Sequence, residues 1–421
     1  MGMKKTEIGM IPEEWDVQSF SDTFRVLNNN TYSRAELNYD SGQFKNIHYG
    51  DVLILFPEVL DCTREDVPYI NDGLRISSSA QPLQDGDVVM ADTAEDETVG
   101  KVTEVTNTSD KPVMAGLHTI PFRVKSGKFV AKWLGYYMNS HLYHDQLLPY
   151  IHGTKVSSVS KGSLGDTVII VPKTSEQEKI VNALSDVDTL IENLKKVIRK
   201  KKNVLYGSMQ KLMIGEIRLQ GFYEEWELVE IGSVAKVIDP HPSHRAPEAV
   251  EYGIPFVGIG DIDEEGNINK KSARIVDESV YAEHSQRYDL SKNLIGIGRV
   301  ASLGKVIRLR NDIGEYAISP TMAVIDFESI DPMFAYYYMR SSEFQDQFTS
   351  SSNGSTRQSV GMHYIRNLYI RKPSLEEQVE LSRCLGDMDY EIRKLEEKYS
   401  KYQKVKQGMM EELLTGKVRL V

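Results

Sequence analysis

Two long stretches of the sequence, residues 172–219 and 373–420, are copies of each other and align without a gap at an offset of 201. Sixteen of their 48 positions are identical, over a length at which chance agreement is excluded. The identical pairs include Pro172/Pro373, Glu176/Glu377, Gln177/Gln378, Leu184/Leu385, Gly215/Gly416 and Arg218/Arg419. Any fold for this chain must therefore give two equivalent segments equivalent surroundings.

Each copy has the signals of one long helix. Pro172 and Pro373 fix φ at the start, Ser175 or Ser374 can cap the first turn, and a glycine follows the last apolar residue. In between, apolar residues recur at steps of four and three, which is the heptad pattern of a coiled coil. The predicted seam residues are Ile180, Leu184, Val187, Ile191, Leu194, Ile198 and Leu205 in the first copy, and Leu381, Leu385, Met388, Ile392, Leu395 and Tyr402 in the second.

A seam of this kind needs a partner, and the other copy in the same chain is the nearest one available. We therefore predict that the two helices pair with each other; a lone helix lying on its own domain is the alternative. Lys201 and Lys406 interrupt the seams. Polar residues at such positions can fix the register of a helix pair at a cost in stability.

The repeat extends beyond the helices. Residues 133–147 match 334–348, and residues 152–160 match 353–361, at the same offset. Further upstream, where Trp15 aligns with Trp226 and Arg34 with Arg245, the offset drifts to about 210. The chain therefore alternates between globular units and helices, with boundaries at 1–171, 172–219, 220–372 and 373–421.

Each globular unit mixes two kinds of pattern. Short strands bounded by turn residues are predicted at 85–92, 98–105, 118–124 and 166–172, and an amphipathic helix at 131–148. We predict two similar α+β units. Because they agree at their edges and differ in their middle segments, we expect them to present different faces and to recognise different targets.

Composition restricts the function. A net charge of −11 argues against a promiscuous DNA coat, but it leaves room for a protein that binds DNA within a larger basic assembly. Cys62 and Cys384 are the only cysteines, so no disulfide framework is expected and a reducing cytoplasm fits. No secretory signal is visible, and no apolar run approaches the roughly 18 residues of a membrane span.

The organisation resembles the specificity subunit of type I restriction–modification systems, over essentially the whole chain. Four features carry the resemblance: the Trp-containing opening of each unit ("IPEEWDV", "FYEEWEL"), the polar loop ahead of a strand ("HGTKVSSVS", "NGSTRQSVG"), the Glu-Gln helix start, and the endings "LMIGEIRL" and "LLTGKVRL". All four occur twice and in the same order. Each is weak by itself, and together they are specific.

The resemblance implies a function and partners. Each unit would be a target recognition domain that reads one half of a split sequence in double-stranded DNA. The long helices would pair antiparallel and fix the spacing of the halves. Two methyltransferase (M) subunits would dock on the scaffold, restriction/translocase (R) subunits would join them, and the chain itself would catalyse nothing. S-adenosylmethionine, ATP and Mg would be needed only in the partner subunits.

Two polar loops are the first candidates for DNA contact. Glycine lets the backbone approach a ligand closely, hydroxyl and N–H groups suit phosphate oxygens, and Arg and Gln suit guanine and adenine edges. The alternative is an ordinary solvated loop. The candidate residues are Thr154, Lys155, Ser157 and Ser158 in the first copy, and Ser355, Thr356, Arg357, Gln358 and Ser359 in the second.

Earlier loops at residues 28–34 and 239–245 supply a second set of candidates. Tyr32, Arg34, His244 and Arg245 suit groove or backbone contacts, although turn chemistry also explains the Asn, Asp and Pro around them. Arg299 is a lone positive charge in a Gly-rich stretch and is a further candidate.

No catalytic residue and no metal site is predicted. "FVGIG" at 256–260 is similar to a methyltransferase cofactor loop, but no catalytic Asn-Pro-Pro motif accompanies it, and "GRVASLGK" fails the P-loop spacing. The run Tyr336–Tyr338 is expected in a core or a partner contact. Two alternatives remain for the function: a specificity chain for a fused methyltransferase–nuclease of another restriction type, and a coiled-coil scaffold that binds proteins and not DNA.

Overall fold

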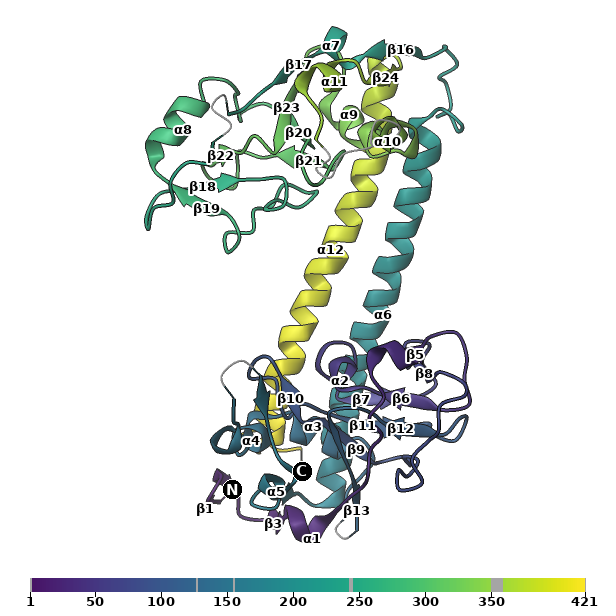
Figure 1. Cartoon of the computed structure of the whole chain (residues 1–421), viewed down its shortest axis with the longest axis vertical. Coiled ribbons are helices and arrows are strands. Elements are labelled where there is room, and N and C mark those ends of the chain that lie inside the picture. Colours follow the sequence, from purple (N-terminus) through teal and green to yellow (C-terminus); the bar gives the residue numbers. More distant parts are fainter. Residues whose placement is uncertain (1, 126–127, 154–155, 242–244, 350–358, 421) are drawn as a thin grey trace. The chain divides into compact units, whose positions relative to one another are not determined.

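The computed structural model describes residues 2–125, 128–153, 156–241, 245–349 and 359–420 and divides the chain into two units (Figure 1). Unit 1 comprises Met1–Leu194 and Lys398–Val421, and unit 2 comprises Lys195–Glu397. The helices α6 (Thr174–Met213) and α12 (Leu375–Leu414) each contribute one end to each unit. Mixed sheets and helices in both units confirm the predicted α+β class.

Unit 1 is built around two sheets, with strand orders β4-β13-β9-β11-β7 and β12-β6-β8-β5. The first, called the main sheet, contains β4 (Phe24–Val26), β7 (Val59–Asp61), β9 (Val88–Ala91), β11 (Val102–Thr106) and β13 (Thr119–Val124). The second contains β5 (Leu37–Asn38), β6 (Lys45–Ile47), β8 (Tyr69–Ile70) and β12 (Val113–Ala115).

Short strand pairs and helices complete unit 1. The pairs are β1 (Met3–Thr6) with β2 (Gly9–Pro12), β3 (Asp16–Ser19) with β15 (Val168–Val171), and β10 (Thr93–Ala94) with β14 (Ser157–Ser158). The helices are α1 (Phe20–Thr23), α2 (Tyr49–Ile54), α3 (Trp133–Met138), α4 (His141–His144) and α5 (Lys161–Leu164), with 3-10 turns at Arg34–Glu36 and Leu148–Tyr150.

Unit 2 has a main sheet of order β17-β23-β20-β21 and a second sheet of order β19-β18-β22. Its strands are β16 (Glu227–Glu230), β17 (Ala235–Ile238), β18 (Ile254–Val257), β19 (Arg274–Val276), β20 (Leu294–Gly298), β21 (Val306–Leu309), β22 (Ala317–Ile318), β23 (Met322–Phe327) and β24 (Tyr369–Lys372). Its helices are α7 (Ile231–Val234), α8 (Glu278–His284), α9 (Pro332–Met339), α10 (Ser342–Thr349) and α11 (Met362–Arg366).

The two main sheets follow one plan, down to their register. β11 pairs with β9 so that Glu104 faces Val88, and β21 pairs with β20 so that Arg308 faces Ile295. Both pairs are antiparallel, as are β13 with β9 and β23 with β20. The duplication seen in the sequence is thus a duplication of structure, and residues of the two units can be matched by strand register.

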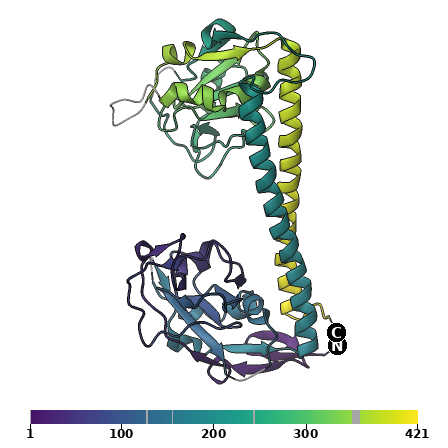
Figure 2. The same cartoon turned by 90° about the vertical axis from the view of Figure 1, so that its right-hand side faces the viewer.

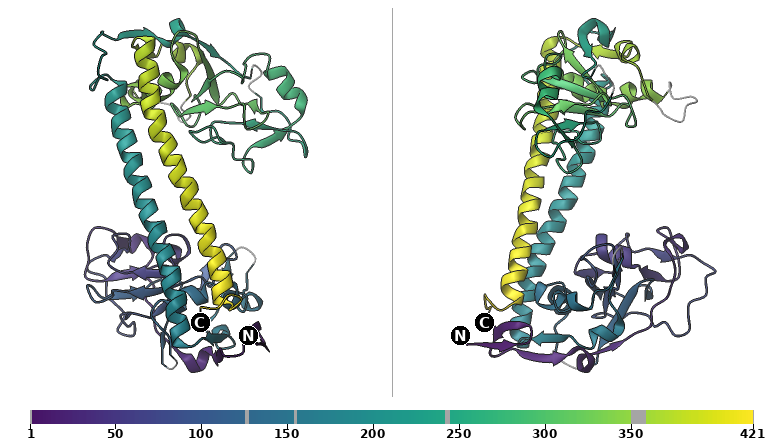
Figure 3. Two further views of the ribbon diagram at one scale, coloured as in Figure 1. Left: turned by 180° about the vertical axis from the view of Figure 1, so that it is seen from behind. Right: turned by 60° about the vertical axis from the view of Figure 1, so that its left-hand side comes forward.

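Each unit pairs one end of α6 with one end of α12, and the two segments run side by side and antiparallel (Figures 2 and 3). In unit 1, Ile180 and Leu184 of α6 pack in one core with Leu413 of α12. In unit 2, Met209 and Leu212 pack with Leu381 and Leu385. None of the predicted seam residues is exposed: Ile180, Leu184, Ile191, Leu194, Leu381, Leu385 and Ile392 are buried, and Val187, Ile198, Leu205, Met388, Leu395 and Tyr402 are half-buried.

The lysines that interrupt the seams have different surroundings. Lys406 is 12 % exposed and forms ion pairs with Asp188 at 2.7 Å and Glu58 at 2.5 Å, all within unit 1. Lys201 lies at the surface of unit 2 and pairs with Glu391 at 2.6 Å. An exposed pair of this kind contributes roughly 0–1 kcal/mol, whereas Lys406 is held by two carboxylates in a partly enclosed place.

Two local expectations differ from the structure. Ser175 lies inside the first turn of α6, because the helix begins at Thr174; Ser374 does cap α12, accepting the Glu377 N–H at 3.3 Å. The segment 131–148 is not one helix but α3 and α4. Asn139 separates them, because its side chain bonds the Val102 carbonyl at 2.9 Å and holds the chain against β11.

A buried carboxylate ties the helix ends together in each unit. Glu176, in the first turn of α6, accepts bonds from Trp15 Nε1 at 2.9 Å and from Arg419 at 2.5 and 2.9 Å. Glu377, in the first turn of α12, accepts matching bonds from Trp226 Nε1 and Arg218, and these three contacts measure 2.9, 2.8 and 2.8 Å. We call these the Trp–Glu–Arg clusters. In both, the segment that follows one long helix closes on the start of the other.

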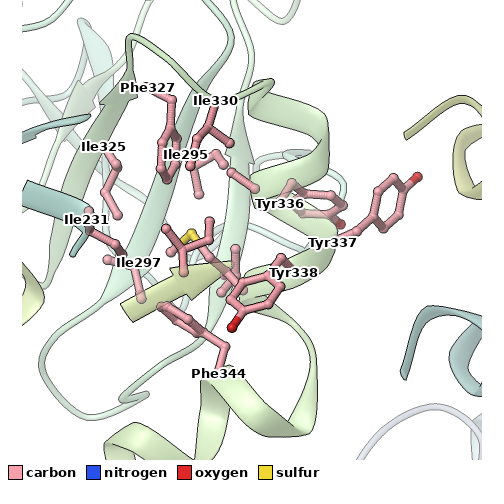
Figure 4. Packing of buried hydrophobic residues seen from close by; sticks show 14 of the residues in the cluster. Ile231, Ile295, Ile297, Ile325, Phe327, Ile330, Tyr336, Tyr337, Tyr338 and Phe344 are labelled. Atoms are coloured by element: carbon pink, nitrogen blue, oxygen red, sulfur yellow. The ribbon is translucent and has the colours of Figure 1, made fainter. Parts of the chain in front are cut away.

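The core of unit 2 lies between its main sheet and α9 (Figure 4). Ile295, Ile297 and Ile325 from the sheet face the helix in the same cluster. The residues Tyr336, Tyr337 and Tyr338 are at most 3 % exposed, so the aromatic run belongs to the core. Complete burial of one isoleucine side chain, such as that of Ile295, stabilises a fold by about 1.5–3 kcal/mol.

The Trp–Glu–Arg cluster of unit 1 predicts a large loss of stability in Arg419→Met. Glu176 is 3 % exposed, and the substitution leaves its charge buried with only Trp15 as a partner. We expect a loss of about 3 kcal/mol, measured as a shift of the urea unfolding transition. The control is Lys417→Met, which removes the same charge two residues away from an exposed pair with Glu411. Equal shifts for the two variants would contradict the role given to the cluster.

Candidate nucleic-acid interface

The polar loops of both units join the main sheet at the same point. Val159 donates its N–H to the carbonyl of Asp92, directly after β9, at 2.9 Å. Val360 donates to the carbonyl of Arg299, directly after β20, at 3.0 Å. Asp92 and Arg299 thus occupy equivalent positions beside equivalent loops, and they carry opposite charges.

In unit 1 the guanidinium of Arg34 lies at the surface and is held by a buried carboxylate, that of Asp51. It pairs with Asp51 at 2.6 Å, where the Arg34 side chain is 45 % exposed and that of Asp51 is 2 % exposed. A second N–H donates to the hydroxyl of Tyr39 at 3.1 Å. Burial and the neighbouring Arg34 charge lower the pKa of His48, which accepts the Gly50 N–H at 3.2 Å. Arg34 is therefore a fixed, half-exposed cation.

Aromatic and hydrogen-bonding side chains lie next to Arg34. The ring of Tyr49 contacts the rings of His48 and His118, with centroids 4.6 and 5.2 Å apart. His118 Nδ1 lies 3.5 Å from Asp92, whose carboxylate also accepts the Thr93 hydroxyl at 2.8 Å. These residues come from four separate segments, so the sheet frame and not a single loop brings them together.

In unit 2 the equivalent place is organised around Arg299. Its side chain is 15 % exposed, lies 3.5 Å from Asp239, and donates to the carbonyl of Val360 at 3.2 Å. Arg299 therefore links the segment after β17 to the end of the polar loop. Ser359 pairs with Val300 through an isolated β-bridge and is exposed, and Arg245 is exposed.

Of the remaining sequence candidates, three lie within the described residues and seven lie outside them. Ser157 and Ser158 form β14 beside β10, next to Thr93 and Ala94. The hydroxyl of Tyr32 donates to the Arg75 carbonyl at 2.5 Å, so it fastens a loop. Seven candidates lie outside the described residues: Thr154, Lys155, His244, Ser355, Thr356, Arg357 and Gln358.

The arrangement offers different chemistry in the two units. A guanidinium matches the two acceptors of guanine in the major groove, and a carboxylate accepts from the amino group of cytosine. Hydroxyl and backbone N–H groups around them suit phosphate oxygens. Two frames with one geometry thus place a carboxylate, Asp92, at this position in one unit and a largely enclosed guanidinium, Arg299, in the other.

Sequence reasoning missed Tyr49, His118, Asp92 and Asp239. Each lies at the end of a strand or beside one, and only Asp239 has a marked neighbourhood in the sequence, because it begins the candidate loop 239–245. His118 adopts a left-handed conformation with φ of 54°, which is uncommon outside glycine and turns its backbone at the strand start. For the unit 1 residues Tyr49, His118 and Asp92, only the alignment of Asp92 with the candidate Arg299, which needs the changing offset between the copies, could have pointed to the place.

Other classes of site find no support in the described residues. Within the described ranges, no group of three or more His, Cys, Asp or Glu side chains could hold a metal ion. No helix in the same ranges is long and apolar enough to cross a membrane. Burial raises the pKa of the Cys62 thiol to about 12, which keeps it protonated and unreactive.

Comparison with known proteins gives concordant results. A family model described as the type I restriction modification DNA specificity domain matches the chain twice, over residues 12–201 and 223–406. The chain is 24 % identical to the putative type I restriction enzyme MjaX specificity subunit of Methanocaldococcus jannaschii, covering 99 % of this chain and 96 % of the relative. It is 26 % identical to the MjaVIII specificity subunit of the same organism, over 64 % of this chain and 66 % of the relative.

Solved structures with the same fold include the S subunit of a type I restriction-modification system from M. genitalium. That chain has a TM-score of 0.52 and 12 % identity, with 96 % of each chain covered. A chain from a structure of the type I R-M system, solved to explain its complex assembly and conformational transition, has a TM-score of 0.53 and 16 % identity, with 97 % of this chain and 99 % of the other covered.

The substitution Arg34→Lys tests whether the guanidinium of Arg34 contacts DNA. Lysine keeps the ion pair with Asp51, so the unit should stay folded, but it cannot present the planar fork. We expect binding to labelled double-stranded DNA to weaken by about 1–3 kcal/mol in a fluorescence anisotropy assay, with an unchanged thermal midpoint. Arg25→Lys, an exposed arginine on β4, is the control. If both variants bind as the unmodified chain does, Arg34 does not contact DNA.

Proposed function

The chain belongs to the type I restriction modification DNA specificity family, and we propose that it recognises DNA for a type I restriction–modification complex, each unit reading one half of a split target. The observation that carries this proposal is the pair of matched frames with opposite charge at one position, Asp92 and Arg299. Two equal frames with unlike faces fit two unlike half-sites. A scaffold that only binds proteins has no need of them.

The long helices are proposed to set the spacing of the half-sites. A helix is stiff over its length and rises 1.5 Å per residue, so the length of the paired segments can determine which spacer fits. Two linked reading units bind far more tightly than either one when the linker matches the span. Chemistry is assigned to other subunits: S-adenosylmethionine, ATP and Mg would act there, in the cytoplasm, and not on this chain.

Docking of two methyltransferase subunits is proposed at a helix face that the two copies share. Lys200, Val204 and Gly207 lie at helical spacing on one face of α6, and Lys401, Val405 and Gly408 repeat them on α12. Lys200, Val204, Lys401, Val405 and Gly408 are exposed, so packing within the chain does not explain their identity. Among the described residues, no side chain lies within 4 Å of where a Cβ of Gly207 or Gly408 would stand.

A glycine in the middle of a helix costs roughly 0.5–1 kcal/mol compared with alanine. A glycine at this position in both long helices, with open space beside it, favours close approach by a helix of a partner subunit. Because the face occurs once in each unit, a partner should bind twice. The same duplicated face would be presented to a methyltransferase in both places.

A change in helix length tests the spacing proposal. One extra heptad inserted after Ile198, with a second after Leu395 on the other helix, keeps the seam in phase and adds about 10.5 Å. We expect methylation mapping to show a spacer longer by about three base pairs, at 3.4 Å per base pair. A seven-residue insertion in the segment 220–224, which follows α6, is the control and should leave the spacer unchanged. An unaltered spacer in the lengthened chain would contradict the proposal.

The shared glycines predict a change in assembly without loss of folding. Gly207→Gln should raise the thermal midpoint, since glutamine favours the helix, yet block one docking face. We expect the particle mass in ultracentrifugation to show one methyltransferase per chain, and none in the double variant Gly207→Gln/Gly408→Gln. Lys195→Gln, at an exposed position on another face of the same helix, should keep two. Full occupancy of the double variant would place the docking surface elsewhere.

A further inference from the structure

A cavity of about 490 Å³ opens in unit 2 between the edge of the main sheet, α9 and α12. Lys292, Arg308, Arg310 and Arg393 line it, and Asp312 is the single carboxylate among the described residues that do so. Counting Asp312 and the Asp326 carboxylate that pairs with Lys292, four cations and two carboxylates leave an excess of two positive charges, in a chain whose net charge is −11. We call this the cationic cavity.

Two of the four cations are not engaged in ion pairs within the described part of the fold. Lys292 and Arg310 each form an ion pair of 2.6 Å with a carboxylate of unit 2. The guanidinium groups of Arg308 and Arg393 form no hydrogen bond or ion pair with any described residue. Arg308 is half-buried on β21, and Arg393 projects from α12, so two unpaired guanidinium groups reach the cavity from different elements.

The same positions in unit 1 have a different character. The register of the main sheets matches β21 to β11, and the repeat offset matches α12 to α6. The matched pairs are Lys292/Asp85, Arg308/Glu104, Arg310/Thr106 and Arg393/Glu192. Four cations in unit 2 therefore stand where unit 1 has three carboxylates and a threonine. The cationic cavity belongs to one unit and not to the shared frame.

Glu104 has a structural role in unit 1 that the matched residue Arg308 does not have in unit 2. It accepts the backbone N–H groups of Lys132 and Gly135, at 2.5 and 2.9 Å, at the start of α3. In unit 2 the start of α9 is capped by its own Asp331, which accepts the Phe334 N–H at 2.8 Å. Arg308 is therefore not needed to cap α9.

The edge of the sheet is also more open in unit 2. In unit 1, β7 runs along β11 beyond Glu58. In unit 2 the backbone N–H of Arg308 donates to the carbonyl of Glu264, and the chain then turns at Gly266, which has φ of 89°. No described strand follows along β21 on that side.

We propose that the cationic cavity binds a phosphate of the DNA backbone, so that unit 2 supplies a larger share of the electrostatic attraction to DNA than unit 1. This inference rests on the proposed function. Arginine forks match phosphate oxygens, and the amides of Asn293 and Asn311 add donors in the same lining. Cations that converge on one hollow from a strand, a turn and a helix suit a compact anion with several acceptors.

The test uses Arg308→Gln/Arg393→Gln. Both side chains are unpaired among the described residues, so their replacement leaves no orphaned carboxylate and the chain should fold normally. The matched control is Lys236→Gln/Arg383→Gln, which removes two exposed charges of the same unit. The full chain, assembled with its methyltransferase subunits, is titrated with labelled double-stranded DNA at several salt concentrations.

We expect the cavity variant to bind about tenfold more weakly at low salt. The slope of log affinity against log salt should fall by roughly 0.9 for each phosphate that the variant no longer neutralises, and the control should keep its slope. A slope equal to that of the control overturns the inference and leaves DNA recognition intact. Absence of DNA binding by the unmodified complex overturns the proposed function and the inference together. Unchanged DNA binding with weaker methyltransferase association would show that the cavity takes an acidic protein segment instead.

Discussion

The structure depends on two buried carboxylates, Glu176 and Glu377. Each sits in the first turn of a long helix, where the helix dipole favours a negative charge, and each is neutralised by an arginine from the end of the other helix segment. A buried charge of this kind is tolerated only when its partners are complete. The requirement links a tryptophan at the start of a unit, a helix start and a helix end in one contact, and this explains why all three recur in both copies.

On that fixed frame the two units differ in charge at matched places. Arg299 replaces Asp92 after the equivalent strand, and Arg308 replaces Glu104 on the equivalent edge. In the second case the reason is visible, because Asp331 takes over the capping task that Glu104 performs in unit 1. A small change of local hydrogen bonding thus releases a position for a new electrostatic role without disturbing the sheet.

Much of the fold could be predicted from the sequence, because heptads and strand patterns are local signals. The seam residues, the main strands and the α+β class all follow from spacing within a few residues. The Trp–Glu–Arg clusters could not, since Trp15 and Glu176 are 161 residues apart and Glu176 and Arg419 are 243 apart. The break at Asn139 was missed because it depends on a bond to the neighbouring strand β11. The places of Tyr49 and His118 depend on the sheet frame, and the drifting offset hid the pairing of Arg308 with Glu104.

Unit 1 is discontinuous in the chain, whereas unit 2 is not. Residues Lys195–Glu397 form unit 2 from one stretch, but unit 1 needs Lys398–Val421 as well as Met1–Leu194. During synthesis from the N-terminus, all residues of unit 2 are made before Arg419, so Glu176 lacks its arginine partner until after unit 2 has been made. Until then the early α6 surface around Ile180 and Leu184 lacks its packing partner Leu413. The unit whose synthesis begins first would thus be the last to complete its packing.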